Sequence, residues 1–540
     1  MAKKCCVLIL AATIVALALR LPRLRQRPMH GDEAVHADKF GELLEDGVYT
    51  YDPYEYHGPT LNYLTLIPSL MTSAKKLTEV NEFTLRIVPV FFGVSLVLLV
   101  LLIGRDLGSS AAAYAAVLTA ISPAMVFYSR YYIQEMLLVS FTFGAIVFGY
   151  RYAQSRKIAW AILSGMSLGL MHATKETCII AYGSMFLAVF VMLLMRREKG
   201  SVVNAVKWIR PSHFLAFLAA GAVVSALFYS SFFSNPRGIL DSFLTYTTYF
   251  DRAGGNNLHV HPWYYYIKML LYCRFFDGPR WSEALIVLLA LVGFIAVMIK
   301  KGLSNANIHL VRFLGFYTLI LTVVYSLIPY KTPWCMLGFL HGMILLAGVG
   351  AVVLVRLLPN IVPRLIILLL IFEGSVFLSW QAYQSNYVYY SDSRNPYVYA
   401  HPTDEVFTIV QRIEEMARVH PDGYRMHIQV ICPGKDYWPL PWYLRRFEYD
   451  TIDWSESVDN SGASAPLIIC SPEVEAALTR KLYTLTPIEQ RQMYMFLFDK
   501  PYYMWLRPKV KLLGFVRKDL WDAHYVSPDP EKLIRESSKK

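Results

Sequence analysis

The sequence predicts a polytopic α-helical membrane protein that carries an external α/β domain at its C-terminal end. Of its 540 residues, 55% are hydrophobic and only 17% are charged. Apolar runs long enough to cross a bilayer, which takes about 20 residues, recur along the first two thirds of the chain. After Tyr383 the composition becomes that of a water-soluble domain. We therefore expect a membrane part at residues 1–384 and an external domain at residues 385–540.

Eleven apolar runs have the length of a span. They lie near residues 5–22, 84–104, 111–128, 133–150, 158–174, 178–195, 213–231, 282–299, 311–329, 334–355 and 364–381. The further run "TLNYLTLIPSLM", residues 60–71, is short and contains Asn62 and Pro68, which favours an interfacial or re-entrant helix. An alternative for the first run is a signal peptide, with "ALA" at residues 16–18 as the cleavage site. The count of spans is therefore about eleven.

Basic residues between the runs predict the orientation. Alternate loops contain most of them: Arg151, Arg156, Lys157, Arg196, Arg197, Lys199, Lys207, Arg210, Lys300, Lys301, Arg312, Arg356 and Arg364. The intervening loops hold little more than Arg130, Lys175 and Lys331. Because cytoplasmic loops are enriched in Lys and Arg, we expect a cytoplasmic N-terminus, and an external loop at residues 23–83. The net charge of +12 then reflects membrane orientation rather than nucleic-acid binding. Arg20, Arg23, Arg25 and Arg27 depart from this rule.

The C-terminal region alternates strand-like and helix-like segments. "RMHIQVIC" and "PLIIC" are typical of buried strands, and "RQMYMFLFD" of a later strand. "DEVFTIVQRIEEMARV" and "SPEVEAALTRKL" have helical patterns. This alternation predicts a small α/β layer. Cys432 and Cys470 end the first two strands, and their pattern fits either a disulfide or two buried thiols.

Polar residues gather near the predicted external ends of the spans. "MHGDEAVHA" contains Asp32 and Glu33, and "YEYHGPTLNYL" contains His57. Further members are Arg130 and Glu135 in "SRYYIQE", Lys175 in "HATKET" and Lys331 in "YKTPW". Charges at membrane depth are costly and usually mark function. Structural alternatives are a helix cap for Asp32 and Glu33, a snorkelling Lys175, and a structural pair of Arg130 with Glu135.

In their order along the chain, these motifs resemble the GT-C superfamily of membrane glycosyltransferases. The resemblance rests on "DE" after the first span, "HGPTLNYL", "TLRIVPVFFG", "SR" with a later acid, and "ATKE". In particular it resembles the branch that contains protein O-mannosyltransferases and the lipid-A aminoarabinose transferase. "NPYVYAHPTDEV", residues 395–406, is similar to the flippase-activity-associated subfamily of N-glycosylation pathways. The family's "HPPL" or "KPPL" is here His57-Gly58-Pro59-Thr60, and its "TKG" is Thr174-Lys175-Glu176.

The resemblance implies an inverting transfer of a sugar from a polyprenyl-phosphate-linked donor to a glycan, lipid or protein acceptor, on the external face of the cell membrane. By similarity, Asp32 accepts the acceptor's proton in the catalytic site, and Glu33 belongs to that site. The implied substrate-binding residues are His57, Arg130, Glu135, Lys175 and Lys331, whose cations would stabilise the departing phosphate.

Three points stay open from the sequence. Carboxylates and histidines such as these are able to hold Mg²⁺ or Mn²⁺, but the residues do not decide whether a divalent cation is required. A transporter or flippase for a lipid-linked saccharide is the main alternative function. A non-catalytic accessory subunit of a glycosylation pathway is the other, since "HGPT" and "TKE" both depart from the family pattern.

Overall fold

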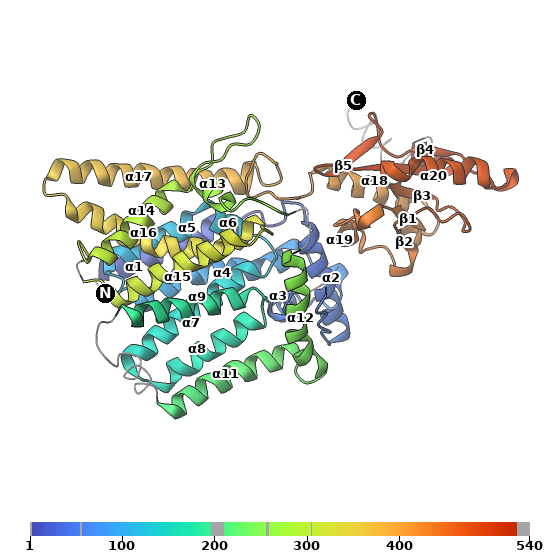
Figure 1. The fold of residues 1–540 in the computed structure, drawn as a ribbon. Coiled ribbons are helices and arrows are strands. Elements are labelled where there is room, and N and C mark those ends of the chain that lie inside the picture. The colour runs from blue at the N-terminus through green and yellow to red at the C-terminus, as the bar shows by residue number, and fades with distance from the viewer. Residues whose placement is uncertain (1–2, 55–56, 196–209, 255–258, 304, 526–540) are drawn as a thin grey trace. The chain divides into compact units, whose positions relative to one another are not determined.

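The computed structural model describes residues 3–54, 57–195, 210–254, 259–303 and 305–525 (Figure 1). The chain forms two compact units. The first, here called the membrane unit, consists of Met1–Arg25, Lys39–Lys76 and Val80–Tyr399. The second, here called the C-terminal unit, consists of Gln26–Asp38, Leu77–Glu79 and Ala400–Lys540. Helix α2 (Gly31–Asp46) begins in the C-terminal unit and ends in the membrane unit.

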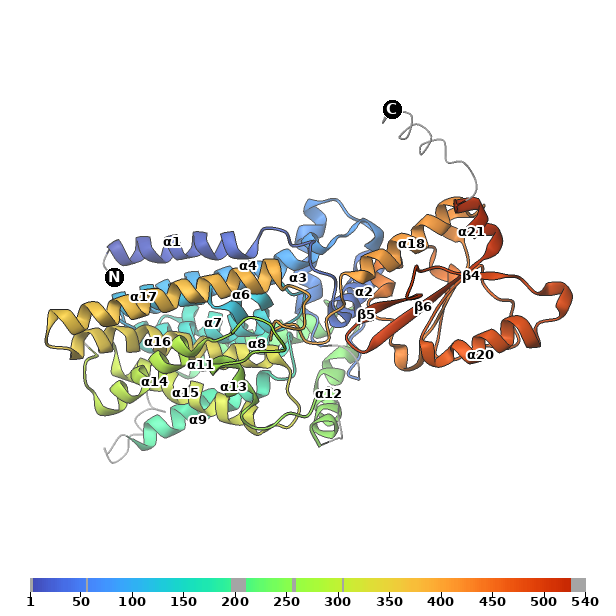
Figure 2. The same ribbon diagram turned by 90° about the horizontal axis from the view of Figure 1, so that it is seen from above.

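The membrane unit is built from helices. They are α1 (Lys3–Arg20), α3 (Thr60–Met71), α4 (Glu82–Ile103), α5 (Ser109–Ile121), α6 (Pro123–Ser129), α7 (Glu135–Ser155), α8 (Ile158–His172), α9 (Cys178–Leu194), α11 (Pro211–Tyr229), α12 (Arg237–Gly254), α13 (Tyr265–Leu271), α14 (Ala284–Ile299), α15 (Ile308–Leu327), α16 (Leu337–Leu357) and α17 (Ile361–Tyr383). Most of the long helices run roughly side by side, and α12 lies across their direction (Figures 1 and 2). Each of the eleven expected apolar runs is helical.

Length and composition confirm a multi-pass membrane protein. Within the described residues, six helical segments are long and apolar enough to cross a bilayer: α4, α7, α11, α15, Pro333–Leu357 and Ile361–Val388. The bent pair of α5 and α6 makes a seventh. Helices α8, α9 and α14 are apolar but shorter, and α1 carries three basic residues. The eleven predicted runs are thus all present as helices, while fewer of them have full spanning length.

The predicted run at residues 111–128 is broken at Ser122, where α5 and α6 meet at 58°. A buried carboxylate on a distant segment satisfies the backbone at this break: Glu283 accepts hydrogen bonds from Ser122 Oγ and from the Ala124 N–H (3.1 Å). Arg20 donates to the carbonyls of Thr119 and Ala120 at the end of α5 (2.9 and 2.8 Å). Arg20 therefore has a structural role, which accounts for one of the arginines that depart from the charge rule.

Glycines allow α14 and α16 to approach closely. A Cβ atom at Gly350 would lie 1.9 Å from the carbonyl oxygen of Leu289, and one at Gly293 would lie 2.3 Å from that of Leu346. Close backbone contact of this kind is how helices associate where hydrophobic burial gives no net gain. These contacts hold together the part of the bundle that carries the loop before α16.

The C-terminal unit contains a sheet with strand order β2-β1-β3-β6-β4, and β5 pairs with β6. The strands are β1 (Ile428–Ile431), β2 (Ile452–Ser455), β3 (Leu467–Cys470), β4 (Tyr494–Phe496), β5 (Tyr503–Arg507) and β6 (Val510–Arg517). Strands β2, β1 and β3 are parallel, and β6 is antiparallel to β3. Helices α18 (Glu405–Val419), α19 (Leu440–Leu444), α20 (Glu475–Arg480) and α21 (Lys518–Tyr525) complete the unit. The predicted α/β layer is confirmed.

Two separate apolar clusters form the core of this unit. Cys432 belongs to one and Cys470 to the other, and both are buried free thiols. The interpretation as two buried thiols is therefore the correct one.

Candidate active site

The two adjacent acids at the start of α2 have different environments. Glu33 is buried, and its Oε2 accepts a hydrogen bond from the His30 N–H at 3.1 Å, while Arg27 Nη2 lies 3.5 Å from its other oxygen. A glutamate in the first turn that reaches back to the preceding N–H is a helix-capping arrangement. The side chain of Asp32 is 51% exposed, and His30 Nδ1 lies 3.8 Å from its Oδ1. Glu33 thus stabilises the start of the helix, and Asp32 presents its carboxylate outward from it.

The motif "HGPT" docks against the turn between α8 and α9. The Thr60 N–H donates to the Ala173 carbonyl (3.1 Å), and the hydroxyls of Thr60 and Thr174 are 2.8 Å apart. A Cβ atom at Gly58 would lie 2.3 Å from the Ala173 oxygen, so only glycine fits this approach. The structure therefore joins the two motifs that depart from the family pattern.

The buried carboxylate of Glu176 connects the "HGPT" segment to the turn between α8 and α9. His57 Nδ1 lies 2.9 Å from Glu176 Oε2, and Tyr51 Oη donates to Glu176 Oε1 at 3.1 Å. Burial opposes ionisation of Glu176, but the charge and hydrogen bond of His57, together with Lys175, hold the pKa of Glu176 below its usual value. Glu176 is thus an anion with two fixed partners, and it orients the imidazole of His57.

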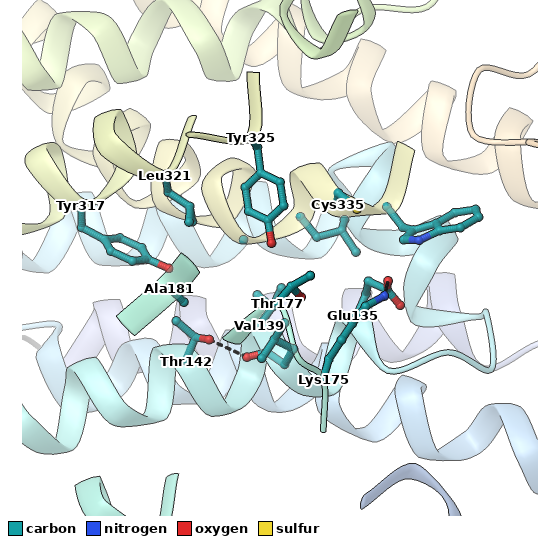
Figure 3. Close-up of a pocket in the computed structure, with 14 residues that line it drawn as sticks. Glu135, Val139, Thr142, Lys175, Thr177, Ala181, Tyr317, Leu321, Tyr325 and Cys335 are labelled. Atoms are coloured by element: carbon teal, nitrogen blue, oxygen red, sulfur yellow. Dashed lines mark hydrogen bonds and ion pairs between the residues drawn. The ribbon is translucent and has the colours of Figure 1, made fainter. Parts of the chain in front are cut away.

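Lys175 forms a buried ion pair with Glu135, the first residue of α7. Burial disfavours the charge on Lys175, but Glu135 outweighs this effect, and the pKa of Lys175 lies above its usual value. The pair lies at one end of a pocket between α7, α9, α15 and the start of α16 (Figure 3). Tyr317 and Tyr325 extend into this pocket from α15. The pocket therefore combines a charged end with a largely apolar wall.

Arg130 and Lys331 bind backbone carbonyls. Arg130 donates to the carbonyls of Arg20 (2.8 Å), Pro22 (2.7 Å) and Arg23 (3.3 Å), so it holds the chain that leaves α1. The ammonium of Lys331 donates to the carbonyls of His261 (3.1 Å) and Ile328. Burial lowers the pKa of Lys331. Both cations are buried, and both connect loops at helix ends.

Comparison with known proteins shows the fold to which this arrangement belongs. Residues 12–237 match the family model described as "Dolichyl-phosphate-mannose-protein mannosyltransferase". ArnT from Cupriavidus metallidurans in the apo state is similar with a TM-score of 0.61 at 14% identity, covering 94% of this chain and 97% of that chain. The structure of the same ArnT bound to undecaprenyl phosphate is similar with a TM-score of 0.59 at 14% identity, covering 95% of this chain and 98% of that chain. The chain has the GT-C fold.

A second GT-C protein is also similar over nearly the whole chain. The archaeal oligosaccharyltransferase AglB from Archaeoglobus fulgidus, in complex with an inhibitory peptide and a dolichol-phosphate, gives a TM-score of 0.55 at 11% identity, covering 96% of this chain and 77% of that chain. No curated protein sequence matches the chain. These similarities show the fold that the motif resemblance implied.

Within this fold, the turn that links α8 and α9 brings together some of the predicted site residues. Three of the predicted substrate-binding residues gather there: His57, Glu135 and Lys175. Arg130 and Lys331 belong to separate hydrogen-bond networks. Asp32 and Glu33 are part of the C-terminal unit, so their place beside this turn stays a prediction.

Glu176, the carboxylate that organises this turn, was not among the predicted site residues. Glu176 stood in the sequence as the departure from "TKG", which was the available indication, but only the fold pairs it with His57 and Tyr51. Among the described residues, no three His, Cys, Asp or Glu side chains come together as metal ligands.

Proposed function

We propose that the chain is an integral membrane glycosyltransferase that moves a sugar from a polyprenyl-phosphate-linked donor to an acceptor on the external face, with inversion. One observation carries this proposal: the fold is shared over 94% of this chain and 97% of ArnT, and a second ArnT structure contains undecaprenyl phosphate. The match of residues 12–237 to the mannosyltransferase family model is consistent with it. The acceptor belongs to one of three classes: a glycan, a lipid or a protein.

In this proposal Asp32 is the general base. The acceptor's nucleophilic atom attacks the anomeric carbon, and the bond from that carbon to the lipid phosphate breaks with its electron pair leaving on the phosphate. The acceptor's proton passes to Asp32, whose exposed carboxylate is suited to receive it. Glu33, with its backbone and arginine partners, positions Asp32 by fixing the first turn of α2.

The departing lipid phosphate requires positive charge, which we assign to Lys175, with Arg130 and Lys331 as further cations. Lys175 is the strongest candidate because it lines a pocket with a largely apolar wall. Glu135 holds the ammonium in place, and His57 contributes a hydrogen-bonding ring at the same turn. A phosphate would then exchange with, or add to, the present partners of Lys175.

The location of the buried charges favours an enzyme over a transporter or flippase. Glu135 begins α7, and Lys175 and Glu176 lie in the turn between α8 and α9. Transporters typically bind substrate near the middle of the bilayer, between broken helices of paired repeats. Charges at the ends of helices suit chemistry at the membrane surface.

The proposal includes an orientation: a cytoplasmic N-terminus, with residues 29–60 and the C-terminal unit outside. In a cysteine-free background, a cysteine at the exposed Ser457 should react with a membrane-impermeant maleimide on intact cells. A cysteine at the exposed Ser155, at the end of α7, should react only after the cells are opened. Labelling with the opposite pattern would contradict the orientation and the external site together.

Replacement of Asp32 tests the assigned base. Asp32→Asn keeps the shape of the side chain but removes its ability to accept a proton, so sugar transfer should fall by about 10²- to 10⁴-fold. Binding of polyprenyl phosphate should change little, because the loss belongs to the transition state. The matched control is Asp38→Asn, an exposed acid on the same helix, which should transfer at the parent rate. If Asp32 only favours the start of α2, its replacement costs less than about 1 kcal/mol, and equal nonzero rates would remove it from the mechanism.

A further inference from the structure

Two loops and one later segment of the membrane unit meet in a cluster of histidine and aromatic side chains. One loop follows α12 and contains His259 and His261; the other follows α15 and contains Tyr330 and Lys331. The loops pair through their backbones: the Lys331 N–H donates to the His259 carbonyl (2.9 Å), and the His261 N–H donates to the Pro329 carbonyl (3.1 Å). Here the set His259, His261, Tyr330 and Tyr399 is called the His–Tyr cluster.

Two imidazoles of this cluster converge on one phenol. His259 Nδ1 lies 2.6 Å from Tyr399 Oη, and His261 Nε2 lies 3.4 Å from the same oxygen. These three groups are partly exposed, and each is able to donate or accept a hydrogen bond. They form a small polar surface on which both kinds of hydrogen bond are offered.

Aromatic rings surround this polar surface. His261 stacks on Tyr265 with ring centroids 4.3 Å apart and an angle of 20° between the planes. Tyr330 lies edge-on to His259 at 5.1 Å and is 38% exposed. Next along the first loop, Trp263 is 63% exposed. Ring faces are therefore available beside the hydrogen-bonding groups.

A rigid support underlies the cluster. The ammonium of Lys331 bridges the two loops by donating to the carbonyls of His261 and Ile328. The ring of Trp334 meets that of Tyr399 at 86°, with centroids 5.9 Å apart. Preorganised side chains lose little freedom when a ligand binds, so such a surface is suited to recognition.

We infer that the His–Tyr cluster binds a saccharide ring. Sugars present hydroxyls that both donate and accept, and C–H faces that pack on aromatic rings, which matches the two features of the cluster. An aromatic belt at the bilayer interface would account for Trp263 and Tyr330, but not for two imidazoles that share one phenolic oxygen. The inference deepens the proposed function, since the ring belongs either to the acceptor glycan or to the sugar of the donor.

The test is saturation-transfer NMR on the full chain in lipid nanodiscs, with methyl hexopyranosides, N-acetylhexosaminides and hexose disaccharides as probes. At least one probe should bind, and Tyr399→Phe, which removes the shared hydroxyl but keeps the ring, should weaken it about three- to tenfold. The control is Tyr264→Phe, the same change on the first loop at an exposed tyrosine outside the cluster, which should bind as the parent does. The second variant, His261→Phe, keeps the stacking on Tyr265 and should also weaken binding.

Adding saturating polyprenyl monophosphate separates the two sources of the ring. If the saccharide still binds in the presence of polyprenyl monophosphate, the ring belongs to the acceptor. If the saccharide no longer binds, the ring belongs to the donor. Both results support the inference. Binding without any sugar transfer would preserve this inference while overturning the proposed function. The inference fails if no probe binds, or if the parent and both cluster variants bind a probe equally well. A further measurement uses brominated lipids, which quench the fluorescence of nearby tryptophans. Quenching by these lipids without any saccharide binding would show that the cluster contacts lipid, and it would also contradict the inference.

Discussion

At the scale of single residues, neighbouring side chains of one type have different surroundings. Glu33 is buried against Arg27 and a backbone N–H, whereas Asp32 is half exposed. The sequence predicted that both acids belong to one site and assigned the proton to Asp32, but it did not predict that Glu33 is buried, because burial depends on residues far along the chain. For example, the Met29 N–H donates to Tyr443 Oη at 2.8 Å, a contact between residues more than 400 positions apart.

The partner of Glu176 is a contact that the motifs did not predict. Its position after Lys175 marked it as a departure from the family pattern, and the three-dimensional structure shows that the departure is matched by His57. A pairing between residues 119 positions apart has no local pattern that would predict it. The contacts of Arg130 are equally distant in the sequence: its guanidinium donates to the carbonyls of Arg20 and Pro22, more than 100 positions away.

The ion pair of Glu176 predicts a pH-dependent stability. Because the folded-state pKa of Glu176 lies below its ordinary value of 4.5, its stabilisation is fully present above about pH 4.5 and is lost as the pH falls further. Glu176→Gln should lower the free energy of unfolding by about 1–3 kcal/mol at neutral pH. Thermal unfolding of both proteins in detergent, measured from pH 7 to pH 3, should show this difference shrinking below pH 4.5. A difference that stays constant down to pH 3 would contradict the assigned anion.

At the scale of elements, periodicity predicted the helices better than their breaks. All eleven apolar runs are helices, because a run of apolar residues that must satisfy its own backbone has few alternatives. The break between α5 and α6 was missed, although "SP" at residues 122–123 was the local indication. The carboxylate that satisfies it, Glu283, comes from a segment 159 residues away. Strands β2, β5 and β6 were also missed, since polar residues interrupt or end them, such as Asp453 in β2 and Lys511 in β6, and leave only short apolar runs.

The docking of two loops predicts a position where only glycine is tolerated. Gly58→Ala would place a Cβ atom 2.3 Å from the Ala173 oxygen, and the contacting atoms are backbone atoms that cannot rotate away. We expect a loss of about 1–3 kcal/mol in stability, together with weaker binding of polyprenyl phosphate, because His57 moves with the loop. The control is Gly183→Ala on α9, where nothing lies within 4 Å of the added atom. If Gly58→Ala and Gly183→Ala have the same unfolding temperature, the two loops do not pack as closely as described.

At the scale of the whole molecule, composition predicted a multi-pass membrane protein, and the order of the motifs predicted its fold. A chain with 55% hydrophobic residues and a polar C-terminal end leads to a membrane bundle joined to an α/β unit, and the GT-C similarity covers 94% of the chain. The sequence did not predict that residues 26–38 would belong to the C-terminal unit. Local composition could not show this, because the segment follows the first span directly and its partners lie beyond residue 400.

The central claim is that the chain breaks the bond between a sugar and a polyprenyl phosphate. It is tested most directly in proteoliposomes that contain a panel of polyprenyl-phosphate hexoses with glycan, lipid and peptide acceptors. Mass spectrometry would follow the lipid and the acceptor in the same sample. The account predicts that polyprenyl phosphate is released in equal amount to the sugar gained by one acceptor, and that Asp32→Asn reduces both. Movement of intact lipid-linked sugar to the other leaflet, with no release of polyprenyl phosphate, would contradict it and identify a flippase instead.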